Sequence, residues 1–139
     1  RLLGNDVCNQ LIRNGDIEYE VPNVTNIGGN MWKGKADIVN HDDKMIIDLK
    51  TTGNISSFRS SAYKYNYDSQ AYIYTQLFKG YDFTFVVIDK TTLQIGVYDC
   101  SSSFYQSGQE KVEQANLNYD LFFKLGDTDP NQFLTTETL

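Results

Sequence analysis

Apolar and polar residues alternate with the period of a β-strand in one early segment of the chain. Residues 16–21, "DIEYEV", put Glu18 and Glu20 on one face. The opposite face then carries Ile17, Tyr19 and Val21. Residues 31–40 and 44–52 predict two further strands, and the polar loop "HDD" between them suits a hairpin. These two strands are therefore expected to pair antiparallel.

Apolar positions spaced three and four residues apart predict helices elsewhere. The spacing occurs in residues 1–13. It returns between residues 60 and 78, where one long helix is expected to end just before Gly80. Residues 101–124 predict a closing helix that serines begin and Gly126 ends.

The remaining segments complete the predicted topology. Residues 82–89 form a nearly continuous β-branched and aromatic run, typical of a central strand buried on both faces, and residues 93–100 predict its neighbour. Residues 23–30 are rich in turn formers and predict a connection. The order β-β-β-α-β-β-α predicts an α/β domain, with a mixed, largely antiparallel sheet flanked by helices. Residues 1–126 are expected to form this single domain, and residues 127–139 a loosely attached or disordered tail.

Composition narrows the class of protein. A chain of 139 residues with 40% apolar and 14% aromatic side chains can build one folded core. Its net charge of -6 argues against a broad basic surface for nucleic acid, so such contacts must be local. No apolar run approaches the roughly 20 residues that span a bilayer, and the first residues lack a signal-peptide core. We expect a soluble, cytoplasmic protein, with Cys8 and Cys100 as unpaired, reduced thiols.

An Asp-x-Lys triplet lies inside the apolar run "MIIDLKTT". A strand places Asp48 and Lys50 on one face, and the hairpin loop can bring Asp37 beside Asp48 on the adjacent strand. Two carboxylates and the backbone carbonyl of Leu49 are hard oxygen donors of the kind that Mg²⁺ prefers. Lys50 could position or help deprotonate a metal-bound water, which indicates phosphodiester hydrolysis.

A plainer interpretation exists for the same charges. Asp37, Asp48 and Lys50 would lie on the solvated face of an antiparallel sheet, with Asp48 paired to Lys50 or Lys35. The apolar run around Asp48 favours the functional interpretation, because a charged pair beside such a run more often has a task.

Three spaced motifs between residues 18 and about 90 resemble a known family. Gly34 and Asp37 make a "GxxD" strand, a hairpin leads to "IIDLKTT", and Gln70 and Tyr74 make a "QxxxY" helix motif. This arrangement is similar to the PD-(D/E)XK nucleases, and more narrowly to their RecB-like and phage or RecE-type exonuclease branch. The resemblance implies a restriction-endonuclease-like core.

The resemblance also implies roles for matching residues. Asp37 and Asp48 would be metal ligands and Lys50 the catalytic lysine, while Gln70 and Tyr74 would contact the DNA backbone or the attacking water. The cofactor would be Mg²⁺, with Mn²⁺ able to substitute. The substrate would be DNA, and a recombination (annealing) protein is a candidate partner.

One more acid often precedes the motif aspartate in this group. Glu20 is favoured over Glu18 for this role, because it lies nearer the turn into the next strand. An exposed strand face explains both residues equally well. The family's N-terminal histidine has no counterpart, and His41 in the hairpin loop is interpreted as a turn residue.

The implied activity is a magnesium-dependent deoxyribonuclease, most simply an exonuclease of phage or prophage recombination type. The alternative is a nuclease-fold module that binds DNA or a partner without cutting it. An endonuclease or a Cas4-like enzyme is weaker, because the cysteine cluster of an iron-sulfur centre is missing. Basic residues near the motifs could attract phosphate, or could be scattered surface charges: Lys33, Lys35, Lys50, Arg59 and Lys64. Tyrosines of the same region could stack on unpaired bases, or could be core residues: Tyr63, Tyr65, Tyr67 and Tyr72.

Overall fold

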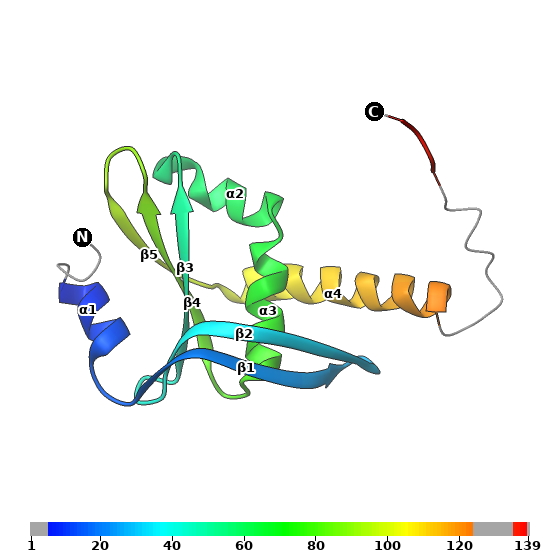
Figure 1. Cartoon of the computed structure of the whole chain (residues 1–139), viewed down its shortest axis with the longest axis horizontal. Coiled ribbons are helices and arrows are strands. Elements are labelled where there is room, and N and C mark those ends of the chain that lie inside the picture. The colour runs from blue at the N-terminus through cyan, green and yellow to red at the C-terminus, as the bar shows by residue number, and fades with distance from the viewer. Residues whose placement is uncertain (1–5, 124–134, 139) are drawn as a thin grey trace.

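A computed structural model describes residues 6–123 and 135–138 and shows helices on both faces of one sheet (Figure 1). The sheet has five strands in the order β1-β2-β3-β4-β5. All neighbours are antiparallel except β3 and β4, which are parallel. The elements are α1 (Asp6–Arg13), β1 (Ile17–Ile27), β2 (Asn30–Asn40), β3 (Met45–Thr52), the 3-10 helix η2 (Ile55–Ser57), α2 (Phe58–Lys64), α3 (Tyr67–Leu77), β4 (Asp82–Asp89), β5 (Ile95–Asp99) and α4 (Ser102–Phe123).

Two apolar clusters hold the helices to the sheet. On one face, α1 packs against the middle of the sheet through Cys8 and Ile12. On the other face, α2, α3 and α4 bury a larger, aromatic cluster. Its core members are Ala36, Val39, Ile46, Phe58, Ala62, Ala71, Phe83, Phe85, Val87 and Phe104. The predicted mixed α/β fold is confirmed, and β4 is buried on both faces because each cluster uses alternate residues of it.

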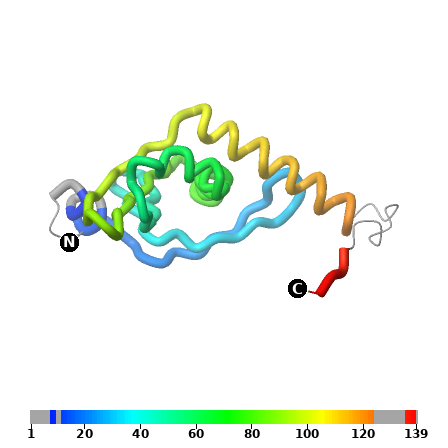
Figure 2. Tube along the Cα trace, turned by 90° about the horizontal axis from the view of Figure 1, so that it is seen from above, coloured from blue at the N-terminus to red at the C-terminus, as the bar shows by residue number. Residues whose placement is uncertain are grey.

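The β1-β2 hairpin extends well beyond the rest of the sheet. β2 pairs with β3 only from Ile38 to Asn40, while its pairing with β1 continues to the hairpin tip. Figure 2 shows the hairpin and α4 meeting at that tip, on the far side of α3. Asn116 of α4 fastens it: the Asn116 side-chain oxygen accepts hydrogen bonds from Asn30 and Trp32, and its amide donates to the Ile27 carbonyl.

The prediction for residues 23–30 was wrong. Most of this segment continues β1 to Ile27, and the turn is confined to Gly28 and Gly29, whose φ values of 60° and 92° suit glycine. Cross-strand pairing with β2 overrides the local turn preference of the asparagines. At Gly28 a side chain would also meet the Asn116 amide at 2.7 Å, so the tip needs glycine for contact with α4.

The predicted alternation along residues 16–21 was also wrong in part. Ile17 packs with the α1-side cluster, whereas Val21 packs with the cluster beneath the other helices. Glu20 explains the change, because its φ of 55° turns the strand between these positions. Such a conformation costs energy in a residue other than glycine. The register of β1 and β2 puts Glu20 opposite Asp37.

The predicted long helix between residues 60 and 78 is two helices. α2 ends at Lys64 and α3 begins at Tyr67, with Asn66 between them in the left-handed region at φ 62°. Asparagine tolerates this conformation better than most residues, which allows the break. α3 ends before Gly80, which has a φ of 86°, as predicted.

The closing helix is confirmed as α4, and the Ser101 hydroxyl accepts a hydrogen bond from the Phe104 amide at its start. The predicted stop at Gly126 lies outside the described residues, as does most of the predicted tail; residues 135–138 have no regular secondary structure. No disulfide joins Cys8 and Cys100, both of which are described. Across the described residues, we find no helix with the length and apolar character needed to cross a bilayer.

Candidate active site

The strand β3 presents Asp48 and Lys50 on the sheet face that α2 and α3 cover. Both neighbouring positions on β4 are apolar, Phe85 opposite Asp48 and Val87 opposite Lys50. Asp48 therefore lies in apolar surroundings and is only 8% exposed. A solvated sheet face does not describe Asp48, although its ion pair with Lys50 is the one that the plainer interpretation also predicted.

Asp37 reaches the same place because β2 and β3 part just before it. Their pairing stops at Ile38 opposite Ile47, and the next hydrogen bond runs instead from the Leu49 amide to Asp37 Oδ2 at 3.1 Å. A side chain thus replaces the ladder bond at the point where the strands diverge. Since the N–H and C=O of one strand residue point to the same edge, the Leu49 carbonyl also faces this gap.

The two oxygens of Asp48 have unlike surroundings. Oδ1 accepts a hydrogen bond from the Gln70 amide on α3 at 3.0 Å. Oδ2 forms an ion pair with the Lys50 ammonium at 3.0 Å, yet this oxygen is buried without a well-aligned hydrogen bond from any described residue. Burial raises the pKa of Asp48 to about 6; Lys50 opposes the shift and the nearby Asp37 carboxylate adds to it.

Lys50 has a second neighbour that the sequence did not reveal in this role. Its ammonium lies over the Tyr67 ring, 4.3 Å from the ring centroid. A cation at this distance is attracted to the ring face, and the contact holds a long side chain in one orientation. Tyr67 is the first residue of α3, so the helix break at Asn66 puts this ring beside the lysine.

Tyr74 of α3 and Glu20 of β1 both contact Lys35 of the hairpin. The Tyr74 hydroxyl donates to the Lys35 carbonyl at 2.9 Å and accepts from the Lys35 amide at 3.1 Å. Burial raises the pKa of Tyr74, so its hydroxyl remains a donor. Gly34 permits this approach, because a Cβ there would lie 3.0 Å from the Tyr74 ring. Glu20 forms an exposed ion pair with Lys35 at 3.0 Å.

The structure therefore brings four predicted residues together at one point: Asp37, Asp48, Lys50 and Gln70. The other acid considered, Glu18, lies elsewhere. Its carboxylate contacts His41 Nε2 at 2.8 Å, and the Tyr81 hydroxyl contacts His41 Nδ1 at 2.7 Å. His41 lies in the turn between β2 and β3, as predicted, and joins that turn to β1 and to Tyr81, the residue before β4.

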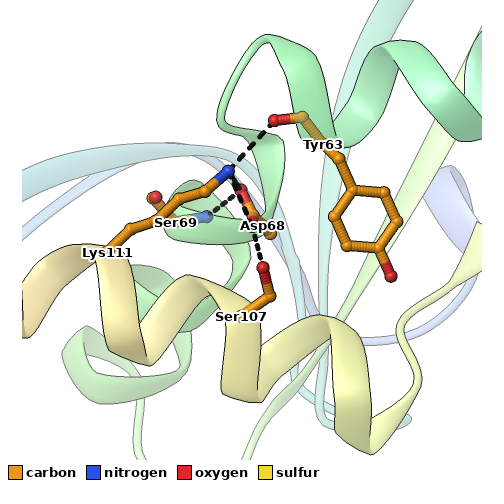
Figure 3. A network of polar contacts seen from close by, with 5 residues as sticks. All are labelled: Tyr63, Asp68, Ser69, Ser107 and Lys111. Carbon is orange, nitrogen blue, oxygen red and sulfur yellow. Dashed lines mark hydrogen bonds and ion pairs between the residues drawn. The ribbon is translucent and has the colours of Figure 1, made fainter.

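A buried polar network fixes α3, the helix that carries Gln70 (Figure 3). The carboxylate of Asp68, at the start of α3, accepts hydrogen bonds from the Ser107 hydroxyl at 2.6 Å and from the Lys111 ammonium at 2.9 Å, both on α4. It also accepts one from the Ser69 amide at 2.9 Å. Lys111 donates as well to the Tyr63 carbonyl near the end of α2, and so ties both sides of the helix break to α4.

The pKa of Asp68 shifts in the opposite direction to that of Asp48. Burial alone would raise the pKa of Asp68, but hydrogen bonds from Ser107, Lys111 and the Ser69 amide outweigh it and lower the pKa. Close approach of the helices makes these bonds possible, because a Cβ at Gly108 would overlap the Asp68 carbonyl. Sequence reasoning missed this network, since Asp68 and Lys111 are 43 positions apart.

The donor atoms at the candidate site suit a divalent cation. No group of three or more His, Cys, Asp or Glu side chains able to hold a metal occurs within the described ranges. Mg²⁺ needs fewer, since one or two carboxylates suffice when water and a phosphate complete the coordination. The Asp37 carboxylate and the buried Oδ2 of Asp48 are such a set, and a cation bound there would add to the ion pair that Oδ2 makes with Lys50.

The PD-(D/E)XK class of domain is defined by a β-hairpin that leads into an Asp-x-Lys strand. A glutamine on a helix donates a hydrogen bond to the aspartate of that strand. The family described as "PDDEXK-like domain of unknown function (DUF3799)" matches residues 1–130, and the chain belongs to this family. A search of curated proteins gives no match.

Solved structures share the fold. A candidate exonuclease from Eubacterium rectale aligns with a TM-score of 0.72 at 16% identity, over 99% of this chain and 59% of that one. A phage-related exonuclease from Haemophilus somnus 129PT aligns with a TM-score of 0.51 at 20% identity, over 86% of this chain and 70% of that one. At these low identities, the alignments show a common fold alone. This chain spans little more than half of the first protein's length.

Proposed function

We propose that the chain is a metal-dependent nuclease that hydrolyses phosphodiester bonds in DNA. The observation that carries the proposal is the Asp48 carboxylate, which is buried beside Asp37 with one oxygen lacking an aligned hydrogen bond. A protein gains no stability from such an arrangement, because a buried ionised carboxylate without enough donors costs free energy. Binding of a cation at this position would remove that cost.

The proposed ligands are Asp37, Asp48 and the Leu49 carbonyl. When bound, a divalent cation supplies charge that stabilises the phosphoryl transition state and lowers the pKa of a coordinated water. Gln70 holds Oδ1 of Asp48, so Oδ2, which also pairs with the Lys50 ammonium, is the oxygen proposed to bind the cation. Family members commonly use divalent metals, and Mg²⁺, with Mn²⁺ as a substitute, is the ion proposed here.

Lys50 is proposed to place the attacking water. Its ammonium already lies 3.0 Å from Asp48 Oδ2 and 4.3 Å from the Tyr67 ring centroid, so it is directed at the reacting region. An ammonium there can donate a hydrogen bond to the water and offset the negative charge of the phosphate. Tyr74 has a different proposed role: it braces the hairpin through Lys35, and thereby sets the position of Asp37 two residues further on.

The hairpin offers a surface on which DNA can approach. An open hollow of about 670 Å³ lies along it, lined in part by Lys33 and Lys35. Lysines so close to the site can attract phosphate although the chain as a whole carries a charge of -6. An exonuclease of phage or prophage type is the proposed subclass, supported by what the two similar structures are described as.

The test is cleavage of end-labelled linear DNA with Mg²⁺ or Mn²⁺, beside calorimetric metal titration. Lys50→Met should lower kcat by about 10²- to 10⁴-fold, the usual range for a group that assists proton transfer. The same variant should still bind the metal, since Lys50 is not a ligand. Lys90→Met, on the turn after β4, is the matched control and should cut normally. Equal cleavage by the Lys50 variant would overturn the assignment.

The alternative of a non-cleaving binding module makes a different prediction in the same assays. DNA would be bound and remain intact with either metal, and Asp37→Asn or Asp48→Asn would not change metal uptake. Metal uptake that depends on both aspartates, together with cleavage, supports the nuclease.

A further inference from the structure

An exposed aromatic ring lies at the end of α2, close to the candidate site. Tyr65 is 59% exposed, although a tyrosine of a folded domain usually buries much of its ring. It follows the last residue of α2 and precedes the left-handed Asn66, so the helix break turns its side chain outward. The other tyrosine of the break, Tyr67, packs against the core.

Two short distances connect this ring to the reacting region. The centroids of Tyr65 and Tyr67 are 6.2 Å apart with an interplanar angle of 39°. The Lys50 ammonium in turn lies 4.3 Å from the Tyr67 centroid. A flat group stacked on Tyr65 would therefore be only two rings from the proposed catalytic ammonium.

Cations flank the same ring. The Lys64 ammonium lies over the Tyr65 ring, 5.6 Å from its centroid. In the sequence, Lys64 precedes Tyr65 and Tyr67 follows it. Together with Lys50, Lys64 places positive charge at both ends of a short aromatic strip, on a chain that is acidic overall. Alternating cations and aromatic faces fit a chain of phosphates and bases, because the cations attract the backbone while the rings accept the bases.

We propose that Tyr65 is a stacking site for an unpaired base of the DNA strand being cut, with Lys64 holding the adjoining phosphate. The proposal rests on the proposed nuclease function and names its substrate class: single-stranded DNA, or a duplex end with a single-stranded overhang. Both faces of a base inside a duplex are covered by its neighbours, and a blunt end exposes only the outer face of its last pair, so an unpaired base is the group that fits this ring best. The stack keeps the strand next to Asp48 and Lys50.

An exposed tyrosine elsewhere in the molecule offers a matched control. Tyr119 is 50% exposed on α4, where it lines a hollow beside the hairpin tip and not the carboxylates. Its ring pairs with Phe123, at 4.9 Å between centroids, and no lysine is placed over it in the described part of the chain. If exposed tyrosines bound DNA non-specifically, Tyr65 and Tyr119 would both contribute to the affinity.

The experiment measures binding without relying on cleavage. Oligonucleotides with 2-aminopurine at successive positions near one end are titrated with the protein in Ca²⁺, as a single strand, a duplex with an overhang, and a blunt duplex. Quenching at one position reports stacking. We expect Tyr65→Ala to abolish that quenching and to weaken single-strand and overhang binding by about 5- to 150-fold. Tyr65→Phe should retain both properties, because the ring and not the hydroxyl is used.

Blunt-duplex binding by Tyr65→Ala, and all binding by Tyr119→Ala, should match the wild type. Unchanged single-strand binding by Tyr65→Ala overturns the proposal, as does an equal loss for the blunt duplex or for Tyr119→Ala. If Tyr65 instead docks another protein, Tyr65→Ala would leave single-strand binding unchanged. Cleavage with Mg²⁺ is scored separately: quenching that depends on Tyr65 without any cleavage would reject the nuclease function and keep the stacking site.

Discussion

Two aspartates are buried in the molecule, Asp68 between α3 and α4 and Asp48 on β3, and their environments are opposite. Asp68 is 0% exposed, and its carboxylate accepts hydrogen bonds from Ser107, Lys111 and the Ser69 amide. Asp48 is 8% exposed and also has a lysine at 3.0 Å, but one of its oxygens lacks an aligned hydrogen bond. The pKa of Asp68 is lowered, whereas burial raises the pKa of Asp48 to about 6.

The difference teaches that a lysine partner does not by itself stabilise a buried carboxylate. The number of aligned donors decides, because each donor replaces part of the hydration that burial removes. At Asp68 the donors outweigh desolvation, and the ion pair holds α3 to α4. At Asp48 they do not, and the neighbouring Asp37 carboxylate adds repulsion. One site supports the fold, and the other is the proposed cation site.

The same substitution should have opposite effects at the two sites, and Asp68 should show the larger one. Asp68→Asn removes the charge that Lys111 pairs with and weakens the tie between α3 and α4. We expect the free energy of unfolding to fall by about 3 kcal/mol, at the low end of the range for broken buried pairs. The low end applies because the Lys111 side chain is 38% exposed and water can reach it. Urea denaturation at pH 7 measures the change, and an unchanged midpoint would contradict it.

Asp48→Asn should instead stabilise the metal-free protein at pH 7. The difference between the ordinary pKa of 3.8 and about 6 corresponds to about 3 kcal/mol, an upper estimate of the gain from making this group neutral. Asparagine can still accept the Gln70 hydrogen bond at its side-chain oxygen. Denaturation in the presence of a chelator measures the gain, and a loss of stability would show that the Lys50 ion pair outweighs desolvation. Nuclease activity should be lost in the same variant.

The pH dependence of stability should separate the two groups. Asp48 has a raised pKa in the folded state, so the folded protein binds more protons between about pH 4 and pH 6, and its stability falls as the pH rises through this range. Asp68 has a lowered pKa, so its contribution is present above the unfolded pKa of 3.8 and is lost as the pH falls below that value. Unfolding free energies of metal-free wild type and Asp48→Asn between pH 3 and 8 test both slopes. The fall between pH 4 and 6 should be missing from the variant.

The smallest expected effect concerns Gln70, which holds Asp48 without being a proposed ligand. Gln70→Ala should weaken metal affinity or activity by about 10- to 100-fold, the usual cost of losing a residue that orients a ligand. Gln109→Ala is the matched control, because Gln109 donates to Glu113 on the exposed side of α4. Metal titration and cleavage assays read both variants. If Gln70→Ala and Gln109→Ala have the same metal affinity and activity, Gln70 does not orient Asp48.

Much of the fold followed from local pattern. The order of strands and helices, the hairpin around His41 and the buried strand β4 were predicted, since period-two alternation and short polar turns are local signals. The errors arose where distant contacts prevailed. β1 extends to Ile27 because it pairs with β2, and the long helix breaks at Asn66 where Lys111 of α4 holds both sides.

The sequence by itself determined which residues were candidates for the chemistry. Asp37, Asp48 and Lys50 were identified from their types and spacing, because strand periodicity decides which side chains share a face, and Gln70 from the resemblance to the family's helix motif. Only the tertiary structure decided how each is used. Burial, the count of aligned donors and the direction of α3 depend on residues far along the chain. They leave Asp48 Oδ2 with an ion pair but no aligned hydrogen bond, satisfy Asp68, and turn Tyr65 toward solvent.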